Sequence, residues 1–183
     1  MTINEARQLM ESWVSNPALR VHMESVAACC AAYAQILAPD ETEKWTVTGL
    51  LHDYDYEKHP TMEEHPFVGV KHLREMGVED DILQAILGHA DYTGVARESQ
   101  LAKVLFAVDE LSGFIVACSK VRPNGISDMK PKSVVKKLKD KAFAAAVSRE
   151  DIALGIEELG VDRTEHIQRC IDAIRAESER LGL

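Results

Sequence analysis

The sequence predicts an all-α protein, a helical bundle of about eight or nine helices. Apolar residues recur every three or four positions along most of the chain, and Val26, Cys29, Cys30 and Tyr33 show this spacing within one segment. Such spacing places apolar side chains on one face of a helix. Residue types that begin or end helices separate these segments, and no segment has a convincing strand pattern. Both observations favour a fold without β-sheet.

Start and stop signals set the order of the expected helices. Thr2 and Glu5 match a capping box, and Asn16-Pro17 supplies a capping side chain followed by a proline at the first helical position. Gly77 is a typical C-terminal stop, and Asp162 opens the last helix. We therefore expect helices over residues 2–14, 16–37, 41–51, 65–76, 79–89, 99–121, 130–141, 149–158 and 162–180.

The length of 183 residues is typical of one domain, or of one domain with a small appendage. The composition changes after the turn Pro123-Asn-Gly125, where a lysine-rich segment begins. We expect a metal-binding helical domain over residues 1–122 and a C-terminal helical extension over residues 123–183 that packs on it. The alternative is that residues 1–183 form one domain.

The composition excludes several classes of function. A net charge of -9 argues against sequence-independent binding to a nucleic-acid backbone, and the longest apolar run is too short to cross a membrane. Residues 1–5 lack the basic and then apolar pattern of a signal peptide. The four cysteines have no C-x-x-C spacing and lie in apolar helical patterns, which is typical of reduced thiols. We expect a cytoplasmic protein that acts on a small molecule; the sequence does not predict its oligomeric state.

An unusual group of polar residues ends the apolar segment Val47 to Leu51. His52, Asp53, Asp55 and Glu57 follow within six residues. Burying such groups costs several kcal/mol unless they pair with an opposite charge or bind a metal. An imidazole alone could satisfy the free carbonyls of a helix end, but that explanation leaves the carboxylate of Asp53 unexplained. We interpret His52-Asp53 as the centre of a metal site.

Further imidazoles and carboxylates lie where a helix is otherwise apolar or where it ends, namely His22, His65, His89 and Asp109. Each has an ordinary explanation alone, as a hydrogen-bonded core residue or a residue at a helix end. Together they offer the donors that suit Fe, Mn, Zn, Co or Ni. One ion could take His22, His52, Asp53 and Asp109. A second could take His65 and His89, with Asp53 bridging the two.

The order of these residues resembles that of the HD superfamily of metal-dependent phosphohydrolases. The resemblance covers about residues 18–122, and His22, His52-Asp53 and Asp109 fall on the motif that gives the superfamily its name. His65 and His89 fall where dinuclear members place two further ligands. The pattern is most similar to bacterial HDIG-domain proteins, a group without a settled substrate. These carry an Asp-Tyr-Glu after the His-Asp pair and a Val-Asp-Glu-Leu-Ser-Gly around the last ligand, here Asp55 to Glu57 and Val108 to Gly113.

The resemblance implies a divalent transition metal cofactor, one or two ions, and hydrolysis of a nucleotide or another small phosphate ester, with His52 and Asp53 at the catalytic centre. A water molecule between two such ions has a lowered pKa and attacks phosphorus as hydroxide near neutral pH. The chain departs from the cyclic dinucleotide enzymes of the superfamily, because Tyr54-Asp55 stands where those have Ile-Gly-Lys. The Gly-Tyr-Pro motif of that branch is also absent.

Two rival functions use the same ligands. One is a non-catalytic signalling or binding module with a structural metal, although six intact ligands argue against a vestigial site. The other is a di-iron oxygenase of the HD type, which consumption of dioxygen by an iron-loaded protein would distinguish from a hydrolase.

Other residues are candidates for secondary roles. Asp55 could orient a ligand histidine through a hydrogen bond. Lys71, Arg97 and Lys103 could reach a substrate phosphate, although most surface cations are simply solvated. The six lysines of residues 130–141 favour the solvated face of an amphipathic helix. The alternative is that this segment covers the pocket and attracts an anionic substrate.

Overall fold

The computed structural model describes residues 1–183 and contains ten α-helices, two short 3-10 helices and no strand, which confirms the predicted all-α class. The α-helices are α1 Ile3–Trp13, α2 Pro17–Leu37, α3 Thr42–Leu51, α4 Phe67–Glu75, α5 Asp80–Gly88, α6 Gln100–Lys120, α7 Pro131–Leu138, α8 Arg149–Leu159, α9 Arg163–Ala176 and α10 Ser178–Leu181. The 3-10 helices are η1 Pro39–Glu41 and η2 Asp91–Thr93. None of the helices is long and apolar enough to span a membrane.

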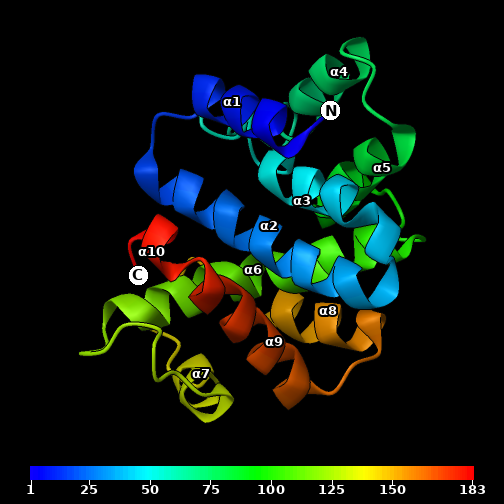
Figure 1. The fold of residues 1–183 in the computed structure, drawn as a ribbon. Helices are drawn as coiled ribbons and strands as arrows, with labels where there is room; N and C mark the ends of the chain where they lie inside the picture. Colours follow the sequence, from blue (N-terminus) through cyan, green and yellow to red (C-terminus); the bar gives the residue numbers. More distant parts are fainter.

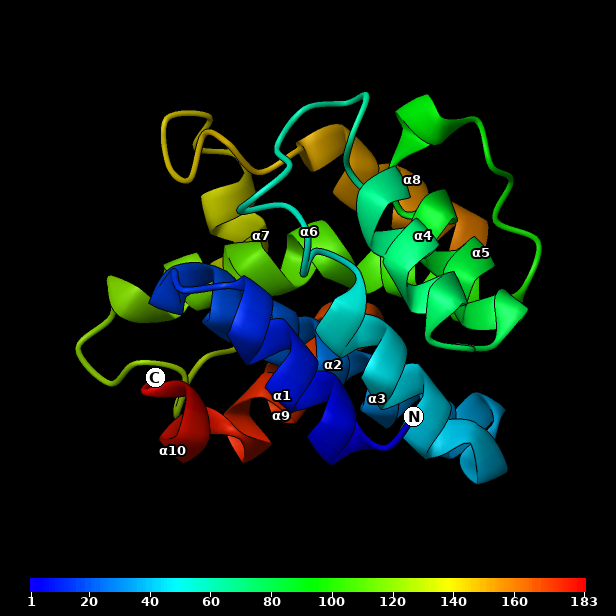
Figure 2. The same cartoon turned by 90° about the horizontal axis from the view of Figure 1, so that it is seen from above.

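The two longest helices, α2 and α6, pack against each other in the middle of the molecule. Figure 1 shows α1, α3, α4 and α5 on one side of α2, and α7, α8 and α9 on the other. Figure 2, which views the molecule from above, shows α3 beside α1, and α4 beside α5. Of these four helices, α3 packs directly on α2 and α5 packs directly on α6.

Two apolar clusters hold the helices together, and α2 contributes to both. The larger cluster joins α2 and α6 to the C-terminal helices, with Phe114, Ile167 and Ile171 fully buried. The smaller joins α1, α3, α4 and α5, with Leu50 and Leu83 fully buried. The C-terminal helices thus share a core with the two helices at the centre of the N-terminal part.

The predicted helix starts at Thr2, Asn16 and Asp162 are confirmed, because each side chain accepts a hydrogen bond from the first turn of its helix, and Ser148 caps α8 in the same way. The last predicted helix differs. It is interrupted at Glu177, whose φ of -102° and ψ of 7° leave the helical region, and α10 then turns Leu181 into the core.

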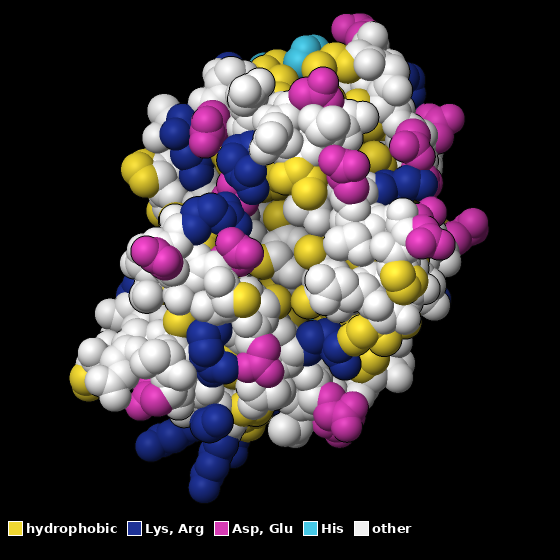
Figure 3. Space-filling view, in the orientation of Figure 1, with side chains coloured by type: hydrophobic (Ala, Val, Ile, Leu, Met, Phe, Trp, Pro, Cys, Tyr) yellow, Lys and Arg dark blue, Asp and Glu magenta, His cyan; other side chains and the backbone are white.

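The lysine-rich segment forms the short helix α7, which buries Pro131, Val134 and Leu138. Its lysines lie on the other side, as expected of a solvated amphipathic helix. Figure 3 shows acidic and basic side chains interspersed over most of one face of the molecule, with a group of basic ones at the lower edge, near α7. That face presents no continuous basic surface of the kind that binds a nucleic-acid backbone.

We predict that Gly155→Ala destabilises the protein. A Cβ atom at position 155 of α8 would lie 2.6 Å from the Cα atom of Ala107 on α6, so the two helices would have to move apart. Overpacking of this kind costs about 1–3 kcal/mol of the free energy of unfolding, which urea denaturation measures. Ala153→Ser, on the exposed face of the same helix, is the control and is expected to change stability by no more than about 0.5 kcal/mol. Equal stabilities of the two variants would contradict the close packing of α8 on α6.

Candidate metal centre

The six predicted ligands lie together, although five segments of the chain supply them. His22 lies within α2 and Asp109 within α6. The pair His52-Asp53 directly follows α3. His65 precedes α4 and His89 directly follows α5, so those helices bring their ends to the same place.

The first group of donors surrounds one oxygen of Asp53. Asp53 Oδ2 lies 3.6 Å from His22 Nε2 and 3.5 Å from His52 Nε2. Asp109 Oδ1 lies 3.0 Å from His22 Nε2 and 3.4 Å from His52 Nε2. The two imidazole nitrogens are themselves 3.2 Å apart. Both carboxylates therefore lie beside the same two imidazole nitrogens.

The second group surrounds the other oxygen of the same carboxylate. Asp53 Oδ1 lies 3.3 Å from His65 Nε2 and 3.3 Å from His89 Nε2, and these nitrogens are 3.3 Å apart. Ligand atoms of His22, His52 and Asp53 lie close enough together to hold a metal ion, and so do those of Asp53, His65 and His89. Asp53 belongs to both, which is the arrangement predicted for a carboxylate that bridges two ions.

The hydrogen bonds of the histidine rings decide which nitrogen faces the centre. His52 Nδ1 donates to the carbonyl oxygen of Gly49 at 2.8 Å, and His89 Nδ1 donates to that of Ile86. In a neutral ring the Nε2 atom then carries the lone pair. The Nε2 atoms of His52, His65 and His89 are therefore free to bind a metal ion when the rings are neutral. The donor set therefore fits a divalent transition metal.

The charges of the cluster also favour a bound cation. Burial opposes the charged form of His52, but the negative charges of Asp53 and Asp109 outweigh it and raise the pKa of His52 to about 9. Burial likewise opposes the charged form of His65, and Asp53 and Asp55 raise its pKa to about 9. The protein surrounds these carboxylates with positive charge, and divalent cations would replace the protons when they bind.

Asp55 holds His65 in place. Asp55 is 1% exposed, and its Oδ1 accepts a hydrogen bond from His65 Nδ1 at 2.7 Å. Its Oδ2 accepts from the backbone N–H of Gly69 at 2.7 Å, a contact that a side chain at position 69 would block. This geometry supports the expectation that Asp55 orients a ligand histidine.

A cavity of about 480 Å³ opens onto the cluster. Its lining includes five of the six predicted ligands, and the buried His52 lies behind them. The sequence did not identify the other lining side chains, which are Tyr56, Ala90, Asp91, Tyr92, Phe106, Glu110, Val147 and Asp151, together with Gly113. Among these residues, only Glu110 could have been suspected from the sequence, because it directly follows the candidate ligand Asp109. Asp151 follows a helix cap, and nothing in its local sequence relates it to a residue 42 positions earlier.

Lys71, Arg97 and Lys103, the expected phosphate-binding cations, are not among the residues that line this cavity. Arg97 donates to Glu158 at 2.7 Å and to Asp91 at 2.6 Å, so its guanidinium is already paired. Lys103 lines a separate hollow with Arg97 and Glu158, and Lys71 is exposed on α4. No lysine of residues 130–141 lines the cavity either.

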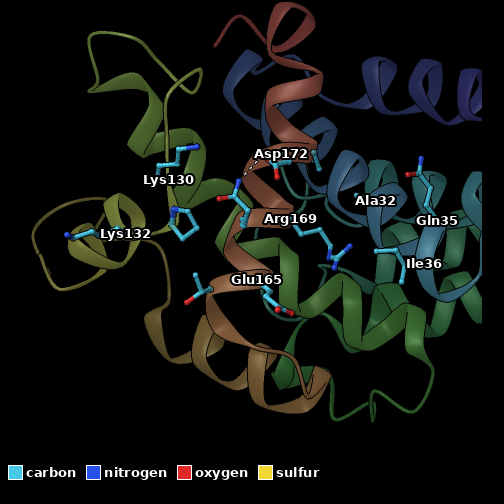
Figure 4. A pocket seen from close by; sticks show the side chains of 12 residues that line it. Ala32, Gln35, Ile36, Lys130, Lys132, Glu165, Arg169 and Asp172 are labelled. Carbon is cyan, nitrogen blue, oxygen red and sulfur yellow. Dashed lines mark hydrogen bonds between the residues drawn. The ribbon is translucent and has the colours of Figure 1, made fainter.

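A larger and shallower hollow of about 910 Å³ lies between α2, α9 and the start of α7 (Figure 4). Its charged side chains have both signs, with Lys130, Lys132 and Arg169 near Glu165 and Asp172. It contains none of the predicted ligands, so it is separate from the candidate metal centre.

Comparison with known proteins agrees with the geometry. The HD domain family matches residues 20–113, just over half of the chain, and this range contains all six predicted ligands. The chain belongs to the HD domain family. HD domains bind divalent metals, and the two clusters are where this chain could hold them. No curated protein and no solved structure matches the chain.

The bridging position of Asp53 predicts how metal content responds to mutation. We expect about two equivalents of metal in the protein purified without chelator or affinity tag. His65→Ala is expected to lose one equivalent, whereas Asp53→Ala is expected to lose both, because only Asp53 contributes to both groups. Elemental analysis measures the content, and His59→Ala, which removes a histidine outside the clusters, is the control. Equal losses in the two ligand variants would contradict a bridge.

The position of Asp55 predicts a weaker effect from Asp55→Asn. An asparagine side chain has one acceptor oxygen, so it cannot accept from both His65 Nδ1 and the Gly69 N–H. Loss of such a partner weakens metal binding by about 10- to 100-fold, which competition with a fluorescent chelator measures. We expect only one of the two equivalents to be affected, and equal weakening of both would argue against a role specific to His65.

Proposed function

We propose that the protein is a metal-dependent phosphohydrolase that acts on a small phosphate ester with two divalent ions bridged by Asp53. One observation carries the proposal: two groups of donors share one carboxylate beside an open cavity. A structural site is closed by its protein ligands, whereas a catalytic site keeps positions for water and substrate. The cavity supports the catalytic alternative over a metal-containing binding module.

The proposed hydrolysis depends on the divalent cations that the imidazole and carboxylate donors can bind. Divalent cations at such a site lower the pKa of water and neutralise charge on the phosphoryl oxygens. The chain's own contribution is to fix the donors. The carbonyl oxygens of Gly49 and Ile86 and the carboxylate of Asp55 orient three imidazoles. Tyr92 donates from its hydroxyl to the carbonyl oxygen of His65 at 2.9 Å and so ties the wall of the cavity to a ligand segment.

The metal, substrate and location are also part of the proposal. Imidazole and carboxylate donors support Fe, Mn, Zn, Co or Ni as the metal. A volume of about 480 Å³ supports a small phosphorylated substrate such as a nucleotide or a simpler ester. Four buried free cysteines support a role in the reducing cytoplasm.

The proposal predicts release of inorganic phosphate from small phosphate esters by the protein loaded with Mn²⁺. Asp53→Asn is expected to lower kcat/KM by at least about 100-fold, the cost of removing a single stabilising group from a site of this kind. His59→Ala, outside the cluster, is expected to retain the activity of the unmodified protein. Uptake of dioxygen by the iron-loaded protein without phosphate release would contradict the hydrolase and support the oxygenase alternative.

A further inference from the structure

The cavity above the metal centre is strongly acidic. Five carboxylates line it, from Asp53, Asp91, Asp109, Glu110 and Asp151, and no lysine or arginine does. Three of the five have partners. Asp53 and Asp109 face the ligand histidines, and Asp91 forms an ion pair with Arg97 at 2.6 Å. Glu110 and Asp151 remain without a cationic partner among the ion pairs of the protein.

The two unpaired carboxylates lie at the junction of α6 and α8. Glu110 follows the ligand Asp109, and its Oε2 accepts a hydrogen bond from the Ser148 N–H at 3.1 Å. Asp151 lies in the first turn of α8, whose Gly155 packs directly on α6. Neither carboxylate has a lysine or arginine partner in the lining of the cavity.

A charge balance restricts the substrate. Two divalent ions bring four positive charges, and the carboxylates of Asp53, Asp109, Glu110 and Asp151 match them with four negative charges. A phosphate monoester then adds up to two more negative charges, and each further phosphate adds another. Since no basic side chain lines the cavity, a polyphosphate finds no compensation there. A substrate that carries its own positive charge would instead be attracted by the carboxylates of the cavity.

The aromatic side chains of the cavity also suit a positively charged substrate. Tyr56 and Tyr92 line it and are 44% and 42% exposed, so their rings are accessible. Aromatic faces attract ammonium groups, and carboxylates beside them add a direct ionic contact. Carboxylates and tyrosines therefore share the lining of one cavity, a composition that suits an organic cation.

Building on the proposed function, we infer that the substrate is a small phosphate monoester whose other end carries an ammonium group, held by Glu110 and Asp151. The phosphate end would lie at the metal centre and the ammonium end against α8. Glu110 lies within residues 20–113, the part that matches the HD domain family, whereas Asp151 lies outside it, so the C-terminal helices supply one of the two carboxylates.

Binding of matched phosphonates tests the inference without requiring turnover. The probes are 2-aminoethylphosphonate, 2-hydroxyethylphosphonate, propylphosphonate and 3-phosphonopropionate, which differ only in an ammonium, hydroxyl, methyl or carboxylate end. Titration calorimetry of the Mn²⁺-loaded protein is expected to show binding of the ammonium probe at least 10-fold tighter than that of any other. Equal or tighter binding of the hydroxyl probe, or no binding of any probe, would overturn the inference.

Two isosteric variants test the assigned residues. Glu110→Gln and Asp151→Asn are each expected to reduce the ratio of ammonium-probe to propyl-probe affinity by at least 3-fold, and their combination is expected to bring it close to one. Asp172→Asn, in the hollow of Figure 4, is the control that should leave the ratio unchanged. A ratio that survives the double substitution would overturn the assignment. Ammonium preference without ester hydrolysis would contradict the proposed function alone, and hydrolysis without ammonium preference would contradict this inference alone.

Discussion

The carboxylate of Asp53 is the contact on which the arrangement of the site depends. One of its oxygens faces His22 and His52, and the other faces His65 and His89. Burial raises its pKa, but the charges and hydrogen bonds of the surrounding histidines outweigh this and hold the pKa of Asp53 well below its usual range. Such a concentration of donors is costly without cations, so the folded chain keeps a site whose stability is linked to metal binding.

Some helices supply a candidate ligand from within the helix, and others supply one at the helix end. α2 and α6 each place one ligand within a long helix, where packing fixes the backbone. α3 and α5 end at their ligands, so the last carbonyl groups of each helix accept hydrogen bonds from the ligand rings. The same backbone groups thus complete a helix end and orient a metal ligand. The C-terminal helices add a wall to the cavity, because α8 packs on α6 through Gly155.

Features that depend on nearby residues were predictable from the sequence. The capping side chains of Thr2 and Asn16 act within one helical turn, and their helices begin where expected. The candidate ligands could also be selected from the sequence, because a histidine or aspartate within an apolar helix stands out without knowledge of its neighbours. Features that depend on distant packing were not. Arg97 was expected near the substrate, but it pairs with Glu158, 61 positions away, and Asp151 reaches the cavity only because α8 crosses α6.

The most direct test of two ions sharing Asp53 is an anomalous difference map from crystals of the Mn²⁺-loaded protein. We expect two peaks, one among His22, His52 and Asp109 and the other between His65 and His89, with Asp53 contacting both. A single peak on one side of Asp53, in a protein that is saturated with metal, would contradict the bridged pair. So would a peak located away from these residues.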